Sequence, residues 1–429
     1  MVSVISQQTS ASGVDGRALL FNPLDPVFNT NPYPHYERLR TMDPVHRSAL
    51  GVWFVGRYED VRSILKDRRF RVQDIPGQLR RKNILLDTKQ ISATQPRNLD
   101  YLIANAENWF AFLEAPDHTR LRGVFTGALH RHSVELLRPF IRDAARALIE
   151  KQLANGRMDL MKDFACILPL NVIARMLGVP KEAFGQVVAW TERLARIFDP
   201  LTSLEELAQL DRVSREFMAY LKGLIAERRV EPQDDLISVL CAERGAQDQQ
   251  ITEQELISVC ILVFGAGEET MVNLLGNGTL ALMNHPEQQR FLRENLDILP
   301  SAVDEFLRYD APLQMTSRTA LEDVEVGGKM IHAGDQVYVA LGSANRDPER
   351  FERPDELDLE RQHNHHMAFA DGHHLCVGAQ LARIEGQEGF RALLEMVPDL
   401  RLAADNLTWR KHLVLRGLIS LPVTFAAQP

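Results

Sequence analysis

The sequence lacks most of the features that mark secreted, membrane-spanning or nucleic-acid-coating proteins. Its 429 residues include only four cysteines, spaced far apart, which argues against a disulfide framework. No segment approaches the roughly 20 consecutive apolar residues of a transmembrane helix, and the N-terminus lacks a charged region that leads into an apolar core. The net charge of −9 combines both signs without a basic stripe. We therefore expect a cytoplasmic protein without a membrane anchor or a nucleic-acid partner.

Neither linkers nor internal repeats or low-complexity segments interrupt the chain. A hydrophobic content of 45% is enough for a large core. We therefore expect a flexible tail over residues 1–20 and a single domain over residues 21–429. The apolar pattern is mostly typical of helices, with a smaller β portion. Helices are predicted over Pro116–Lys222, Glu253–Met283, Ala302–Tyr309 and 379–397, and strands just before Gly56, over 324–341 and over 412–425.

The segment FADGHHLCVGAQLAR, Phe369–Arg383, contains a cysteine that follows two histidines and stands between two glycines. Cysteine and histidine are both zinc ligands, but zinc sites usually show paired ligands at defined spacings. A catalytic thiol needs a base and an orienting group, and neither can be placed. In a haem–thiolate site, Gly372 and Gly378 would let the backbone approach a flat macrocycle, and the helix that follows Cys376 would favour the thiolate. The loop alone leaves haem ligation, zinc binding and a plain loop thiol open.

A second cluster lies in the segment FGAGEETMVNLLG, inside a predicted helix. Gly267 in a helix interior costs about 1 kcal/mol relative to alanine, and close helix packing is its simplest explanation. In a functional interpretation, Ala266 and Gly267 leave room for a flat group. Glu269 and Thr270 then place a carboxylate and a hydroxyl at the same spot, where they can pass protons to bound oxygen. A solvated helix face is the plain alternative for those two side chains.

A third pattern is the pair Glu305 and Arg308, three residues apart on one helix face. On a surface such a pair stabilises a helix by only about 0.2–0.5 kcal/mol, so it gains weight only from its order relative to the other two clusters. The long irregular run from Asn345 to Gly372 also indicates a function, because structureless loops of that length are otherwise uncommon.

In order and spacing, these segments resemble the cytochrome P450 family of haem–thiolate monooxygenases over nearly the whole chain. The cysteine loop resembles Phe-Gly-x-Gly-x-His-x-Cys-x-Gly, and the helix resembles Ala-Gly-x-Asp/Glu-Thr. The resemblance implies a mainly α, single-domain P450 fold with haem b between the Ala266–Thr270 helix and the Cys376 loop. It implies that Cys376 is the axial ligand of the iron and that Thr270 and Glu269 deliver protons. The other implied haem contacts are Ala266, Gly267, Phe369, Gly372 and Gly378, together with the propionate partners His118, Arg122, Arg318 and His374.

Two further features follow from the resemblance. Glu305 and Arg308 are expected to form a buried ionic network with Arg361, which would tie the long irregular run to a helix. Ala370 departs from the family pattern, because it stands where the family has the first loop glycine. Alanine tolerates positive φ poorly, so a slight shift of this turn is expected while haem binding is kept.

The resemblance also implies an activity: an O₂-dependent monooxygenase that hydroxylates or epoxidises a medium-to-large apolar molecule, with a polyketide or other secondary metabolite expected. Electrons are expected from NAD(P)H through a ferredoxin reductase and a ferredoxin. The alternatives are a fatty-acid or terpenoid hydroxylase, a peroxygenase, and a non-catalytic haem sensor or carrier; the acid–alcohol pair argues against the last two. A largely apolar pocket is expected from Gln73–Asn108, Trp190–Leu210, Val263, Phe264, Leu313–Thr316 and Val414–Leu415.

Overall fold

Helices make up most of the chain, as its apolar periodicity predicts. The computed structural model describes residues 21, 25–49, 51–88, 98–198, 202–242, 251–397 and 399–427. The tail predicted for residues 1–20 lies outside these ranges. The helices are α1 (Pro26–Thr30), α2 (Tyr33–Met42), α3 (Tyr58–Lys66), α4 (Ile75–Thr88), α5 (Asp100–Ala106), α6 (Asp117–His132), α7 (Arg138–Leu153), α8 (Leu168–Leu177), α9 (Phe184–Leu194), α10 (Leu204–Val230), α11 (Leu236–Ala242), α12 (Glu253–Asn284), α13 (Pro286–Glu294), α14 (Leu299–Tyr309), α15 (Leu341–Ala344) and α16 (Ala379–Met396).

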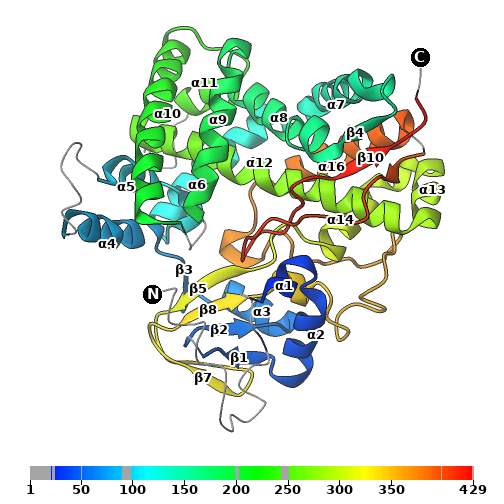
Figure 1. The fold of residues 1–429 in the computed structure, drawn as a ribbon. Coiled ribbons are helices and arrows are strands. Elements are labelled where there is room, and N and C mark those ends of the chain that lie inside the picture. The colour runs from blue at the N-terminus through cyan, green and yellow to red at the C-terminus, as the bar shows by residue number, and fades with distance from the viewer. Residues whose placement is uncertain are drawn as a thin grey trace.

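The β portion is smaller and lies mainly on one side of the helical body. Figure 1 shows the five-stranded sheet with α1–α3 below the helices, and α12 across the middle of the molecule. That sheet has the strand order β1-β2-β8-β5-β3; a second sheet has the order β4-β10-β9, and β6 pairs with β7. The strands are β1 (Val45–Arg47), β2 (Trp53–Val55), β3 (Phe70–Val72), β4 (Arg157–Asp159), β5 (Thr316–Ala320), β6 (Val324–Val326), β7 (Lys329–Ile331), β8 (Gln336–Val339), β9 (Arg401–Leu402) and β10 (Pro422–Thr424).

The central helix α12 confirms the prediction for Glu253–Met283. It begins with a capping box, in which Thr252 and Glu255 satisfy each other's backbone N–H groups, and it ends at Asn284, two residues before Pro286. Its side chains are buried around most of its circumference because α8, α10, α14 and α16 pack against it. No described helix has an apolar stretch long enough to cross a bilayer. The apolar character of α12 therefore reflects a place in the protein core.

Several boundaries agree with the sequence, and one does not. The predicted strand before Gly56 is β2, and the glycine pair Gly327–Gly328 turns β6 into β7 with φ of 55° and 76°. The predicted strand over 412–425 is wrong, since only Pro422–Thr424 is a strand. In the residues before it, apolar and polar side chains alternate, but no continuous partner strand pairs with them. Only isolated bridges join Leu415 to Leu313 and Leu418 to Trp409. Their apolar side chains serve packing in an irregular segment.

Candidate active site

A cavity of about 410 Å³ opens between α12, the cysteine loop, α6 and strand β5. Most of the residues that line it are apolar, and they come from parts of the chain that are far apart. From α12 come Leu262, Val263, Ala266, Gly267, Thr270, Met271 and Leu274, and from the cysteine loop and the start of α16 come Phe369, Ala370, Cys376, Val377, Gly378, Leu381 and Ala382. The buried helix α12 and the irregular cysteine loop thus line the same cavity.

The cysteine loop folds back on itself through a backbone hydrogen bond of 2.9 Å from the N–H of Cys376 to the C=O of Phe369. Gly372 has φ of 75°, and a Cβ there would lie 2.5 Å from the carbonyl oxygen of Leu65. Both backbone conformation and space therefore require glycine at this position. Ala370 also adopts a left-handed conformation, with φ of 59°. The loop thus accepts strain of roughly 1–2 kcal/mol at an alanine.

Cys376 presents its side chain to the cavity. It is the exposed member of the four cysteines, because its accessible surface belongs to the cavity that it lines. Burial within the protein raises the pKa of the Cys376 thiol, while the N–H of Gly378 and the charges of Arg122 and Arg383 act to lower it. Among the described residues, no three His, Cys, Asp or Glu side chains come together as a metal site, so the structure gives the zinc interpretation no support.

Two arginines and two histidines gather near one edge of the cavity: Arg122, Arg318 and His374 line it, and His118 packs against His374 just behind it. Burial, followed by the charge of His374, lowers the pKa of His118 to about 4. The rings of His118 and His374 lie 4.2 Å apart between centroids, and Arg122 donates to the C=O of Leu375 at 2.6 Å. Arg318 is almost fully buried, and burial lowers its pKa to about 10. Its Nη1 donates to backbone and hydroxyl oxygens of neighbouring residues, and no described carboxylate forms an ion pair with it.

The basic group has polar atoms that still need partners. The Nε2 atom of His118 and the Nδ1 atom of His374 are buried without a hydrogen-bond partner. Nearby, the carboxylate of Glu114 lies 3.9 Å from Nε2 of His374 and accepts from the N–H of Val72 at 2.7 Å. Buried polar groups are normally satisfied, so this edge of the cavity fits an anionic group. The two propionates of haem meet that requirement, and the thiol of Cys376 lies on the same cavity.

The α12 wall places its predicted proton-delivery residues on different sides. Thr270 lines the cavity and donates a hydrogen bond of 3.0 Å from its hydroxyl to the C=O of Ala266. The carboxylate of Glu269 is not part of the cavity wall, and its Oε1 lies 3.7 Å from Nη1 of Arg410. The expectation that hydroxyl and carboxylate stand together is therefore wrong for this structure. Successive side chains of an α-helix point about 100° apart, so Thr270 can line the cavity together with Met271 while Glu269 does not.

Gly267 has a packing role that the sequence also allowed. A Cβ at this position would lie 2.8 Å from Cδ1 of Ile173 in α8. Both residues line the cavity, so the glycine lets α8 and α12 approach closely at the cavity wall. Close helix packing and room for a flat group are thus compatible explanations for this position.

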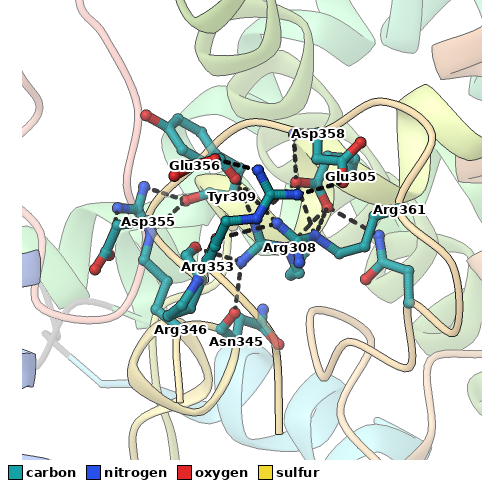
Figure 2. A network of polar contacts seen from close by, with 12 residues as sticks. Glu305, Arg308, Tyr309, Asn345, Arg346, Arg353, Asp355, Glu356, Asp358 and Arg361 are labelled. Carbon is teal, nitrogen blue, oxygen red and sulfur yellow. Dashed lines mark hydrogen bonds and ion pairs between the residues drawn. The ribbon is translucent and has the colours of Figure 1, made fainter. Parts of the chain in front are cut away.

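Glu305 and Arg308 form the centre of a buried polar network, shown in Figure 2. Both side chains are fully buried, and the guanidinium donates two hydrogen bonds of 2.7 Å to the carboxylate. Arg361 adds bonds of 3.2 Å to both carboxylate oxygens. Arg308 also donates to the backbone carbonyls of Asn345 and Pro354. The network thus ties α14 to the irregular run that leads into the cysteine loop.

The predicted substrate pocket is correct in part. Gln73, Val263 and the ends of the Leu313–Thr316 segment line the cavity. Phe264 does not line it, because its ring packs against Phe217 at 5.6 Å in the core. The described parts of Trp190–Leu210, and Val414–Leu415, are absent from the cavity wall, and part of Gln73–Asn108 lies outside the described residues. The wall residues that sequence reasoning missed are apolar and belong to no motif; they include Phe110, Phe112, Phe125, Leu129, Ile173 and Met176.

The fold and this cavity define a candidate haem–thiolate protein, and comparison with known proteins agrees. The family model of cytochrome P450 matches residues 75–396. The chain is 38% identical over 402 residues to the biotin biosynthesis cytochrome P450 of Bacillus subtilis (strain 168), with 93% of this chain and 97% of that protein covered. It is 37% identical over 422 residues to the polyketide biosynthesis cytochrome P450 PksS of the same organism, with 95% and 99% covered.

A solved structure shows the same similarity in three dimensions. The crystal structure of P450BioI in complex with hexadec-9Z-enoic acid ligated acyl carrier protein has a TM-score of 0.83 to this chain at 38% identity. The matched region covers 93% of this chain and 100% of that chain. The chain therefore belongs to the cytochrome P450 family and is a monooxygenase. Membership implies a haem group and electrons from a redox partner.

Proposed function

We propose that this chain is an O₂-dependent monooxygenase that hydroxylates or epoxidises a medium-to-large apolar molecule, with a polyketide or another secondary metabolite as the substrate. The observation that carries the proposal is a single, mostly apolar cavity that has a thiol on one wall, a helix hydroxyl on another and basic groups at its edge. Electrons come from NAD(P)H through a ferredoxin reductase and a ferredoxin.

In this proposal the thiolate of Cys376, which lines the cavity, would ligate the iron of haem b. Arg122, His118, Arg318 and His374 would hold the propionates, which would give the unpaired ring nitrogens of His118 and His374 a partner. Phe369 and Gly378 would lie beside the haem, and Ala266 and Gly267 would leave space for it on the α12 side. Gly372, predicted as a further haem contact, does not line the cavity and instead packs against the backbone of Leu65. The bound haem supplies the redox chemistry that activates O₂ and transfers one of its oxygen atoms to the substrate.

The protein contributes proton control and exclusion of water. The hydroxyl of Thr270 lies on the cavity wall and is held by the C=O of Ala266. In the proposed role it rotates to hold a water molecule, so that protons arrive at one place in the cavity. Glu269, on the neighbouring face of α12, supplies those protons from the side of Arg410.

Substrate class rests on the cavity and on the relatives together. The apolar wall suits a substrate with an extended hydrocarbon surface. One relative is named for polyketide biosynthesis, which favours such a metabolite. A fatty acyl group attached to a carrier protein is the second candidate, because the matched structure of P450BioI holds a fatty acid ligated to an acyl carrier protein.

The proposal is tested by substrate binding and by product yield. The holoenzyme is titrated with polyketide lactones, free fatty acids and acyl carrier proteins loaded with the same acids, and binding is read as a shift of the haem Soret band. Hits are then incubated with NAD(P)H, both redox proteins and ¹⁸O₂. One labelled oxygen atom in the product supports the proposal. Product formed only when hydrogen peroxide replaces the reductant would favour a peroxygenase, and no product from any hit would favour a haem carrier.

The role of Thr270 has a matched control on the same helix. Thr279 makes the same kind of bond, from its hydroxyl to the C=O of Leu275 at 2.7 Å, but it is buried away from the cavity. Thr270→Ala is expected to keep substrate binding and reductant consumption while product per reductant falls and released hydrogen peroxide rises. Thr270→Ser restores most of the yield, and Thr279→Ala leaves it unchanged. Equal yields in Thr270→Ala and wild type would remove Thr270 from proton delivery.

A further inference from the structure

Glu268, the residue between the Gly267 gap and the predicted acid, has no role in the chemistry described so far. It is buried in the middle of α12, with 6% of its surface exposed. Its carboxylate forms no hydrogen bond or ion pair with another described residue. The two carboxylate oxygens are not among the fully enclosed unpaired atoms, so they keep some accessible surface. Burial of most of the side chain on α12 nevertheless favours the neutral acid, which calls for an explanation.

Titratable groups from different elements act electrostatically on Glu268 or are acted on by it. They are Glu269 on α12, Glu192 on α9, Arg410 on the C-terminal segment and Cys166 just before α8. Asp159 lies further away and acts on Cys166. Glu192 is exposed and the side chain of Arg410 is about one-third exposed. These charged groups therefore range from exposed side chains to the buried Glu268. The residue before Glu268, Gly267, lines the cavity.

The cluster holds more acids than bases. Three carboxylates share one guanidinium, and Arg410 forms its ion pair with Glu269. One acid is therefore most stable when it keeps its proton, and the buried, unpaired one is Glu268. Burial, followed by the charges of Glu269 and Glu192, raises the pKa of Glu268 to about 7, while Arg410 acts to lower it. An acid of this kind holds and releases a proton near neutral pH.

We propose that Glu268 is a second acid of the proton-delivery machinery, which holds a proton in the resting protein and passes it to Glu269. The proposal rests on the proposed function of Thr270 and Glu269. The O–H bond of Glu268 breaks and an O–H bond forms on Glu269, directly or through one water molecule. That proton then moves to water held at Thr270, and Glu268 regains a proton from bulk water on the side of Arg410. No electron moves in these steps.

The first test is spectroscopic and needs no turnover. Infrared spectra of the ferric holoprotein are recorded from pH 5 to pH 9, and the carbonyl band of protonated carboxylic acids is followed. A band that disappears with a midpoint near pH 7 is expected, and Glu268→Gln removes it. Glu385 is another buried acid, whose pKa burial raises to about 8, so Glu385→Gln identifies its separate band. Glu268→Asp keeps an acid in place and is expected to keep a band with a shifted midpoint.

The second test measures the relay itself. Glu268→Gln is expected to lower turnover about tenfold, a small part of what general acid catalysis can contribute, and to enlarge the solvent isotope effect, with substrate binding unchanged. Glu150→Gln, an exposed acid on α7, serves as the control. A spectrum without a titrating Glu268 band, or wild-type turnover in Glu268→Gln, would overturn this inference. Neither result depends on Thr270→Ala, whose normal product yield would instead overturn the proposed function.

Discussion

Replacing Glu305 by alanine is expected to remove the anion at the centre of the buried network. Its carboxylate accepts two bonds from Arg308, further bonds from Arg361, one from the N–H of Asp358 and one from the side chain of Asn364. In Glu305→Ala, the fully buried guanidinium of Arg308 keeps only its bonds to carbonyl oxygens and has no counter-charge. Breaking a buried pair in this way costs about 3–5 kcal/mol.

The same sequence pattern on the surface provides the control. Glu59 and Arg62 are also a Glu-x-x-Arg pair at the start of a helix, but their side chains are exposed and 3.8 Å apart. Glu59→Ala is expected to leave stability unchanged within error, because exposed pairs contribute little. Urea unfolding of the holoproteins is followed by tryptophan fluorescence and by the haem absorbance. Equal midpoints for Glu305→Ala and wild type would show that the buried network is not needed for stability, and would refute the argument from burial.

Three further predictions concern the cysteine loop and the buried acid that lines the cavity. Cys376→Ala is expected to fold but to lack the thiolate-type spectrum of the reduced, CO-bound state, and a variant that keeps that spectrum would contradict the ligand assignment. Gly372→Ala is expected to cost at least 2 kcal/mol, since positive φ and the contact with Leu65 both oppose a Cβ, whereas Ala370→Gly is expected to stabilise by roughly 1 kcal/mol; thermal unfolding of the two variants in opposite directions is the check. Burial raises the pKa of Glu385 to about 8, so its contribution to stability is present below its ordinary pKa and is lost as pH rises through about 8. Urea unfolding between pH 5 and pH 9 should show that Glu385→Gln lacks this fall, which amounts to roughly 5 kcal/mol.

The sequence predicted the polar residues at the cavity better than the wall around them. Cys376, Thr270 and Arg318 were identified because each belongs to a segment whose residue types and order are restrictive, and the structure brings all three to one cavity. Phe110 and Ile173 carry no such signal. Many apolar side chains fill a wall equally well, so their place depends on how distant helices pack, which periodicity alone does not show.

Local backbone geometry was predicted less well where a residue type only favours one conformation and does not require it. Ala370 has positive φ although alanine disfavours it. The surrounding loop fixes this conformation: the N–H of Ala370 donates to the C=O of Met367, and the N–H of Cys376 donates to the C=O of Phe369, both at 2.9 Å. Two backbone bonds outweigh a strain of roughly 1–2 kcal/mol. The strand prediction for residues 412–425 was wrong for a related reason. Alternation of apolar and polar residues produces a strand only where a neighbouring strand is available to pair with it.

The position of Glu269 shows why adjacency in sequence is a weak guide within a helix. Neighbouring side chains diverge by about 100°, so Thr270 lines the cavity together with Met271 while the residue before it faces elsewhere. Here that residue meets Arg410, whose backbone N–H bonds to Gly417 in the C-terminal segment. In the proposed mechanism, a charge change at Glu269 would therefore act on proton supply and on the attachment of this segment together. A loss of activity in a Glu269 variant identifies the acid only when the same variant keeps the stability of the wild type, whereas the hydroxyl of Thr270 carries no such second role.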